Sequence, residues 1–173
     1  MNLKEHIVTI PNFPKEGVMF RDVTSLLDDK DTLKESIDSL IKVIGKTKFD
    51  KVVGPESRGF IFGMPVAYAL NKSFVPIRKK GKLPREVISQ EYELEYGTST
   101  LEMHKDSIKK GDKVIIIDDL LATGGTMEAM TKMIESLGGE VVKICVLIEL
   151  PDLNGRKLLS KYDVESIIEF EGD

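Results

Sequence analysis

Short runs of β-branched residues alternate with amphipathic stretches along this chain, and this alternation limits the fold more than any other feature. Lys51–Gly54 and Ser73–Ile77 are predicted as strands, with an apolar helix over Gly59–Leu70 between them. Such alternation is typical of βαβ units, whose parallel strands are buried by helices on both faces. We therefore predict an α/β fold with a mostly parallel, five-stranded twisted sheet flanked by helices.

The rest of the chain continues the same pattern. Apolar residues recur at helical spacing over Thr32–Ile44, and Thr32 followed by Glu35 matches a capping box at the start of that helix. Ligands of such sheets bind at the carboxyl ends of the strands, so we expect the functional residues in those loops. The further predicted elements are strands at Lys113–Ile117, Val141–Leu147 and Ser166–Phe170, a helix from about Gly124 to Leu137, and a short helix near Asn154–Ser160.

Length, composition and charge narrow the class of protein. The chain of 173 residues has the length of one domain, and with 41 % hydrophobic residues it can bury a core. A net charge of −4 gives no general attraction to nucleic acid or to an anionic membrane. No apolar run approaches the roughly 18 residues of a membrane span, and the N-terminal segment lacks the pattern of a signal peptide. We expect a single domain over 1–173 and a cytoplasmic protein.

The most informative segment is the run VIIIDDLLATGGT, Val114–Thr126, in which a small-residue turn follows an apolar strand and opens a helix. Gly124 and Gly125 allow a tight turn and a close approach of the backbone to a ligand. The hydroxyls of Thr123 and Thr126 lie beside the free N–H groups of the helix start. Such a turn is predicted to bind phosphate.

Two carboxylates, Asp118 and Asp119, precede this turn. They repel a phosphate but accept hydrogen bonds from the hydroxyls of a sugar diol, so turn and acids together predict a sugar-phosphate site. From the residues alone, a Mg²⁺ site, a phosphoacceptor aspartate and a turn without function stay open. A P-loop and a dinucleotide fingerprint are excluded by the spacing, and one cysteine with two histidines cannot form a Cys/His metal cluster.

A second loop, Gly54–Gly59, repeats the order of strand, turn and helix start. Ser57, the forked cation of Arg58 and the N–H groups of the helix start are suited to a second anionic group. Two such loops predict a ligand with two phosphate-bearing ends.

The segment from Lys79 to about Ser107 shows no strong period, so it is either an unrecognised element or a functional lid. Five of the eight residues in Arg78–Arg85 are basic, and the following QEYELEYGTST alternates like a hairpin. We interpret 79–107 as a lid, with Gly81 and Gly97 as its hinges.

These residues resemble the type I phosphoribosyltransferases, whose signature is the run VIIIDDLLATGGT. The segments IPNFPKEGVMFRDVTSLL, GPESRGFIFG, RKKGKLP and ELEYGTSTLEMHKD are similar to the adenine-specific members in order and spacing. The resemblance implies the type I phosphoribosyltransferase fold, with a small N-terminal hood over 1–30 and a long flexible lid loop over 79–107. It further implies a homodimer that transfers the phosphoribosyl group of phosphoribosyl pyrophosphate to adenine, giving AMP, with Mg²⁺ bound mainly through the pyrophosphate.

The resemblance also implies a role for each site residue. From the residues alone, Phe20 is a core aromatic, and Glu95 is one acid among Glu91, Glu93 and Glu95. By resemblance, Glu95, Asp118 and Asp119 would be catalytic, Glu95 handling the purine proton and the aspartates the ribose hydroxyls. Ala122, Thr123, Gly124, Gly125 and Thr126 would bind the 5-phosphate, Glu56, Ser57, Arg58, Arg78 and Lys82 the pyrophosphate, and Phe20, Leu120 and the Arg21 backbone the adenine.

One position separates the purine specificities. The hypoxanthine-guanine relatives carry an aspartate where this chain has Ala122, and an alanine cannot carry a proton. The resemblance therefore favours adenine. Two alternatives are kept: a regulator that senses phosphoribosyl pyrophosphate without catalysis, and the same chemistry on xanthine or another purine. The chain has no basic helix of the kind that DNA-binding regulators add.

Overall fold

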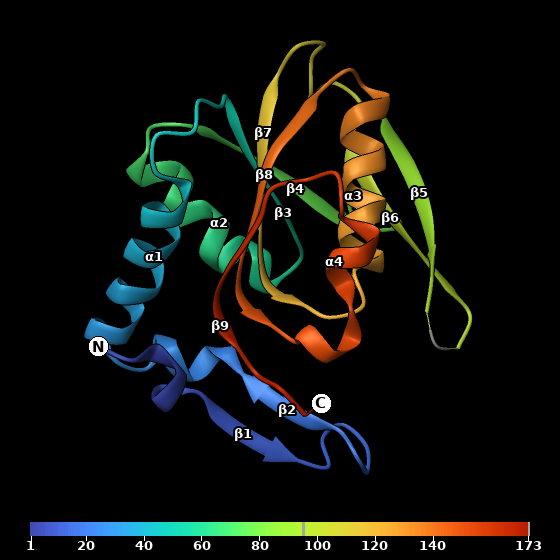
Figure 1. Ribbon diagram of the computed structural model, residues 1–173. Helices are drawn as coiled ribbons and strands as arrows, with labels where there is room; N and C mark the ends of the chain where they lie inside the picture. Colours follow the sequence, from blue (N-terminus) through green and yellow to red (C-terminus); the bar gives the residue numbers. More distant parts are fainter. Residues whose placement is uncertain (95, 173) are drawn as a thin grey trace.

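The computed structural model describes residues 1–94 and 96–172. Their main feature is a seven-stranded sheet in the order β5-β6-β4-β3-β7-β8-β9, with a separate two-stranded sheet, β1-β2, below it (Figure 1). The strands of the large sheet are β3 (Lys51–Pro55), β4 (Ser73–Lys79), β5 (Val87–Glu93), β6 (Thr98–His104), β7 (Lys113–Leu121), β8 (Glu140–Glu149) and β9 (Val164–Glu169). The helices around it are α1 (Lys30–Ile44), α2 (Arg58–Ala69), α3 (Gly125–Ser136) and the short α4 (Gly155–Leu158).

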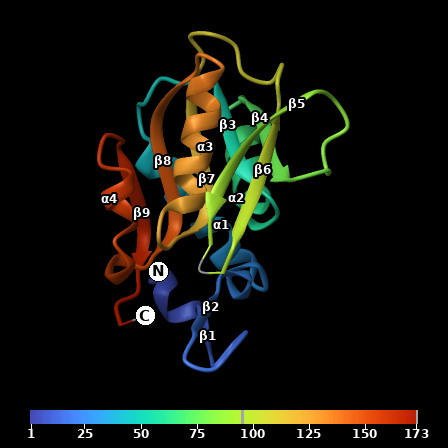
Figure 2. The same ribbon diagram turned by 90° about the vertical axis from the view of Figure 1, so that its right-hand side faces the viewer.

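Strands β4, β3, β7, β8 and β9 are parallel, which confirms the predicted α/β class with a mostly parallel sheet. The predicted number of five strands is too low, because the antiparallel β5 and β6 extend the sheet to seven. Alternate side chains of β7 enter different cores: Ile115 and Ile117 pack with α1 and α2, whereas Val114 and Ile116 pack with α3. Figures 1 and 2 show these helices on opposite faces of the sheet. A strand buried on both faces is uniformly apolar, which is why these runs carry little alternation in sequence.

The start of α1 differs from the prediction. Asp29 is the N-cap, and its carboxylate accepts hydrogen bonds from the amides of Asp31 (2.7 Å) and Thr32 (3.2 Å). The Thr32 hydroxyl instead donates to the Leu26 carbonyl at 2.7 Å. The predicted capping box at Thr32 is wrong, because an aspartate three residues earlier already satisfies the free amides of the first turn.

The segment predicted as a long lid loop contains a β-hairpin, which confirms the hairpin-like alternation of QEYELEYGTST. Strands β5 and β6 pair with each other, and β6 pairs antiparallel with β4, so the hairpin extends the large sheet beside α3 (Figure 2). Its base is anchored by two buried residues of β6. Glu102 accepts hydrogen bonds from the Gly81 amide (2.8 Å) and the Ser89 hydroxyl (2.9 Å), and His104 Nε2 accepts one from the Arg85 amide (3.3 Å).

The residues predicted as a hood contain η1 (Leu3–His6), β1 (Val8–Pro11), β2 (Met19–Asp22) and η2 (Val23–Leu27). The hood is attached to the residue after β9, because the Arg21 guanidinium lies 4.4 Å from the centre of the Phe170 ring. Arg21 also donates a hydrogen bond to the Thr9 hydroxyl at 2.8 Å. The hood therefore lies beside the carboxyl ends of β7 and β8 (Figure 1).

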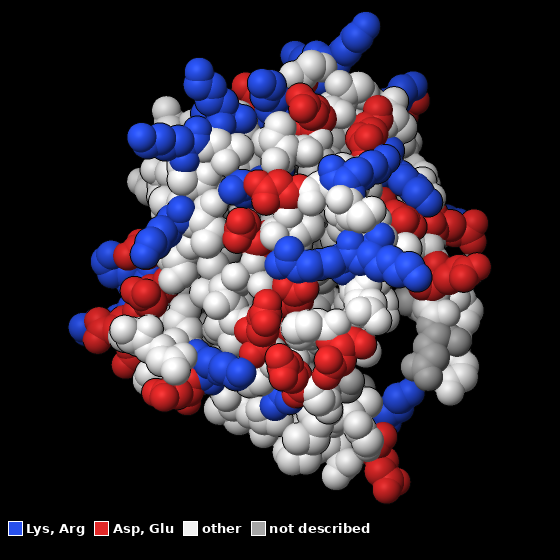
Figure 3. All heavy atoms as spheres, in the orientation of Figure 1, with Lys and Arg blue, Asp and Glu red and all other residues white. Residues whose placement is uncertain are grey.

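The surface mixes both signs of charge. On the face shown in Figure 3, Lys and Arg side chains are interspersed with Asp and Glu side chains. The helices within residues 1–94 and 96–172 are all too short or too polar to span a bilayer.

Candidate active site

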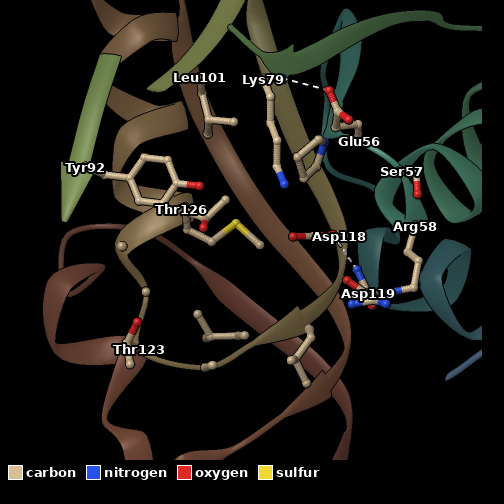
Figure 4. A pocket seen from close by; sticks show the side chains of 17 residues that line it. Glu56, Ser57, Arg58, Lys79, Tyr92, Leu101, Asp118, Asp119, Thr123 and Thr126 are labelled. Carbon is tan, nitrogen blue, oxygen red and sulfur yellow. Dashed lines mark hydrogen bonds and ion pairs between the residues drawn. The ribbon is translucent and has the colours of Figure 1, made fainter. Parts of the chain in front are cut away.

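A cavity of about 380 Å³ opens where the strand order reverses, between β3 and β7. Strand β3 leads through α2 to β4 on one side, and β7 leads through α3 to β8 on the other. Ligands of open α/β sheets bind at such a switch point. The cavity is lined by Pro55, Glu56, Ser57, Arg58, Lys79, Tyr92, Leu101, Asp118, Asp119, Leu120, Leu121, Ala122, Thr123, Gly124, Gly125, Thr126 and Met127 (Figure 4).

The loop between β7 and α3 has free amide groups. Gly124 has a φ of 91°, and a Cβ there would lie 2.7 Å from the Gly155 carbonyl oxygen, so the position requires glycine. No side chain caps α3, and the amides of residues 123–126 have no acceptor within residues 1–94 and 96–172. Unpaired amides at a helix N-terminus are suited to bind an anion.

Asp118 and Asp119 lie within β7, which continues to Leu121 rather than ending at the acids as predicted. The Asp119 amide donates to Asp118 Oδ1 at 2.8 Å, and Asp119 Oδ2 lies 2.5 Å from Arg58 Nε. Burial of the Asp118 carboxyl group, followed by repulsion from Asp119, raises the pKa of Asp118 well above its ordinary value. An incoming hydroxyl donor or cation would relieve this unfavourable pair of charges.

Glu56, in the loop after β3, fixes the end of β4. Its Oε1 accepts hydrogen bonds from the Lys79 amide (2.7 Å) and from Arg78 Nε (3.2 Å). The Lys79 amide is the main reason that the pKa of Glu56 is lowered, and the bond outweighs the opposing effect of burial. Arg58, at the start of α2, lies 5.8 Å from the centre of the Phe20 ring of the hood.

Comparison with known proteins decides the family. Residues 22–173 match the model of the phosphoribosyl transferase domain. The chain belongs to the phosphoribosyltransferase family. It is 63 % identical over 170 residues, 98 % of each chain, to the adenine phosphoribosyltransferase of Lachnoclostridium phytofermentans.

Solved phosphoribosyltransferase structures have the same fold. The adenine phosphoribosyltransferase of Thermoanaerobacter pseudethanolicus superimposes with a TM-score of 0.95 at 53 % identity, over 97 % of this chain and 98 % of that one. The Saccharomyces cerevisiae enzyme, solved with an iminoaltritol bisphosphate and adenine, gives a TM-score of 0.90 at 38 % identity, over 95 % and 96 %.

The phosphoribosyltransferase cavity contains most of the predicted site residues. Phe20, Arg21, Arg78 and Lys82 do not line it, although Phe20 adjoins Arg58 at its rim. Glu95 lies outside the described residues. The predicted residues that the structure brings together are Glu56, Ser57, Arg58, Asp118, Asp119, Leu120, Ala122, Thr123, Gly124, Gly125 and Thr126.

Two polar side chains in the cavity were not predicted from the sequence. Lys79 and Tyr92 point into it from β4 and β5 (Figure 4). Consecutive residues of a strand face opposite sides, so Arg78 turns toward Glu56 while Lys79 faces the cavity. The strand predicted at Ser73–Ile77 stops before both cations, so strand alternation was not extended to Arg78 and Lys79, which belong to β4.

Proposed function

We propose that the chain transfers the 5-phosphoribosyl group of phosphoribosyl pyrophosphate to adenine, releasing pyrophosphate and forming AMP. The observation that carries the proposal is one cavity in which free loop amides, a pair of carboxylates and the cations Arg58 and Lys79 face one another. These groups match a phosphate, a sugar diol and a pyrophosphate. Relatives similar over nearly the whole chain are named adenine phosphoribosyltransferases, and Ala122 stands where a proton-carrying aspartate would serve other purines.

In the proposed reaction, a nitrogen of the adenine imidazole ring attacks the anomeric carbon as the bond to pyrophosphate breaks, with inversion at that carbon. Positive charge develops on the sugar and negative charge on the leaving group, as at other glycosidic centres. Arg58 and Lys79 lie where they can stabilise the departing pyrophosphate. Asp118 and Asp119 hold the ribose hydroxyls, and Tyr92 forms part of the wall that limits access of water.

We include Mg²⁺ in the proposal. Within residues 1–94 and 96–172, no group of three or more His, Cys, Asp or Glu side chains is placed to hold a metal ion. Asp118 and Asp119 nevertheless provide hard oxygen donors whose mutual repulsion a cation would relieve. Mg²⁺ commonly binds through one or two carboxylates together with substrate phosphates. It would be held mainly by the pyrophosphate beside these acids, where it would neutralise charge on the leaving group.

We further propose that the protein is a cytoplasmic homodimer. Helix α2 has an apolar stripe formed by Ile61, Met64 and Tyr68, which are 38, 51 and 88 % exposed. Their spacing of three and four residues places them on one face of the helix. An exposed apolar face of this kind fits a second copy of the chain better than it fits solvent.

A side-by-side assay tests the function. Phosphoribosyl pyrophosphate and Mg²⁺ are offered with adenine, hypoxanthine, guanine, xanthine or orotate, and pyrophosphate release is measured. We expect release with adenine alone. Release with xanthine or hypoxanthine instead would reject the adenine assignment, and binding of phosphoribosyl pyrophosphate without release for any base would indicate a regulator.

Glu95 can be tested by comparison with its acidic neighbours. If Glu95 handles the purine proton, Glu95→Gln should lower kcat by roughly 100-fold and leave the affinity for phosphoribosyl pyrophosphate unchanged. Glu91→Gln and Glu93→Gln serve as controls that should retain activity. Equal losses of kcat and affinity in Glu95→Gln would assign it a structural role.

A further inference from the structure

An ion pair between the buried Glu149 and the half-exposed Arg156 lies behind the phosphate-binding loop, outside the cavity. Glu149, the last residue of β8, is only 3 % exposed. Its carboxylate accepts hydrogen bonds from Arg156 Nε and Nη2 and from the Ser166 hydroxyl, each at 2.8 Å. Arg156 Nη1 also donates to the Val164 carbonyl at 2.8 Å. The guanidinium is therefore fixed in a forked geometry that ties α4 to β8 and β9.

The residue before Arg156 touches the loop directly. A Cβ on Gly155 would lie 2.5 Å from the Ala122 carbonyl oxygen, and a Cβ on Gly124 would lie 2.7 Å from the Gly155 carbonyl oxygen. The two backbones are thus in contact with no side chain between them. The Leu150 amide donates to the Leu121 carbonyl at 2.9 Å and joins the same two segments.

No residue of this ion pair lines the cavity, so neither member contacts a ligand there. Because backbone meets backbone, a shift of Gly155 is transmitted to the loop without a side chain that could adjust. A loop that binds an anion through its amides must hold those amides in one orientation before the ligand arrives.

We propose that Glu149 and Arg156 are positioning residues for 5-phosphate binding, which deepens the proposed function and rests on it. Their bidentate ion pair holds Gly155 against the back of residues 122–124. This contact keeps the loop amides directed into the cavity. The pair therefore acts on the phosphate end of the substrate and not on the pyrophosphate end.

Calorimetric binding of ribose 5-phosphate and of inorganic pyrophosphate tests this assignment. Arg156→Lys keeps the charge but loses the fork, and it should weaken ribose 5-phosphate binding by roughly tenfold or more. Glu149→Gln should weaken ribose 5-phosphate binding to the same extent, and Gly155→Ala should weaken it at least as strongly. Pyrophosphate affinity and kcat at saturating substrate should stay within about twofold of the wild type. If Glu149→Gln fails to fold, Arg156→Lys decides alone.

The control is a second ion pair on the same strand. Lys143 is buried near the other end of β8 and lies 3.3 Å from Asp163. Asp163→Asn removes a carboxylate charge as Glu149→Gln does, and it should lower Tm while leaving ribose 5-phosphate affinity unchanged. Equal weakening in Asp163→Asn would show a general loss of stability and overturn the proposal.

Wild-type binding separates this inference from the proposed function. Wild-type protein that binds ribose 5-phosphate but does not convert adenine contradicts the function and leaves the positioning role standing. Wild-type affinity in both Arg156→Lys and Glu149→Gln overturns the positioning role while the function stands. Absence of ribose 5-phosphate binding in the wild type rejects both.

Discussion

Asp118 combines a raised pKa with a place in the substrate cavity. Because the native state holds this proton more tightly than the unfolded chain does, ionising Asp118 costs stability as the pH rises above the ordinary carboxyl range. Functional sites commonly retain such unfavourable charges because the substrate needs them.

Asp118→Asn should therefore stabilise the protein and inactivate it. We expect Tm near pH 8 to rise by a few degrees, which corresponds to a gain on the order of 1 kcal/mol in the free energy of unfolding. We expect no gain near pH 3, where Asp118 is already protonated in the wild type. Turnover should fall by roughly 100-fold.

Asp112→Asn is the control, because the pKa of Asp112 is shifted in the opposite direction to that of Asp118. Burial raises the pKa of Asp112, but the Lys109 amide and the Lys51 side chain lower it by more. Because its ionised form stabilises the native state, replacing Asp112 by Asn should reduce Tm at neutral pH. A Tm of Asp118→Asn below that of the wild type near pH 8 would contradict the assignment of the pKa.

Lys79, which faces the cavity, gives a second test at the scale of single residues. Lys79→Ala should lower kcat/KM by roughly 10- to 100-fold, because it removes a cation from the pyrophosphate end. Lys80→Ala, at the exposed next position, is the matched control and should retain activity. Full activity in Lys79→Ala would remove this side chain from the mechanism.

The sequence predicted the phosphate loop, the acid pair and the loop after β3, because glycines, acids and helix starts follow apolar strands there. It did not predict Lys79, because the resemblance directed attention to the neighbouring Arg78. Only strand alternation separates the two residues, and the end of β4 could not be located from sequence well enough to apply it.

At the scale of elements, helices and parallel strands were predictable, whereas the hairpin was predicted only in part: the alternation of QEYELEYGTST indicated it, but the whole segment was interpreted as a lid loop. The buried strands form apolar runs such as KVIII, whereas β5 packs mainly through Ile88 and Tyr92 and exposes polar residues between them. A strand that lies half-buried at the sheet edge carries too few apolar residues for its limits and its pairing with the large sheet to be recognised. The buried anchors Glu102 and His104 are polar and gave no sign of burial.

The cap of α1 is tested by two substitutions. Asp29→Ala should lower Tm, because two amides of the first turn lose their acceptor. Glu35→Ala should leave Tm unchanged, whereas the capping box that the sequence predicted would make Glu35 the more sensitive position. Thermal melts of the two variants at neutral pH distinguish these outcomes.

At the scale of the whole molecule, the proposed dimer can be broken at α2. Met64→Asp should convert the protein from the mass of two chains to that of one in analytical ultracentrifugation, because a buried unpaired charge is costly in an apolar interface. Leu33→Asp is the matched control, since Leu33 is a 42 % exposed apolar residue on α1. A dimer that survives Met64→Asp would place the interface elsewhere.

The contact between Gly124 and Gly155 limits which substitutions these two positions can accept during evolution. A Cβ on Gly124 would meet the Gly155 backbone, and a Cβ on Gly155 would meet the Ala122 carbonyl oxygen, so neither position opens to substitution while the two segments keep this contact. In a library randomised at both positions and selected for growth on adenine, survivors should retain glycine twice rather than exchange compensating pairs. A motif scan that weights 122–126 alone overlooks half of this constraint, which lies some thirty residues downstream.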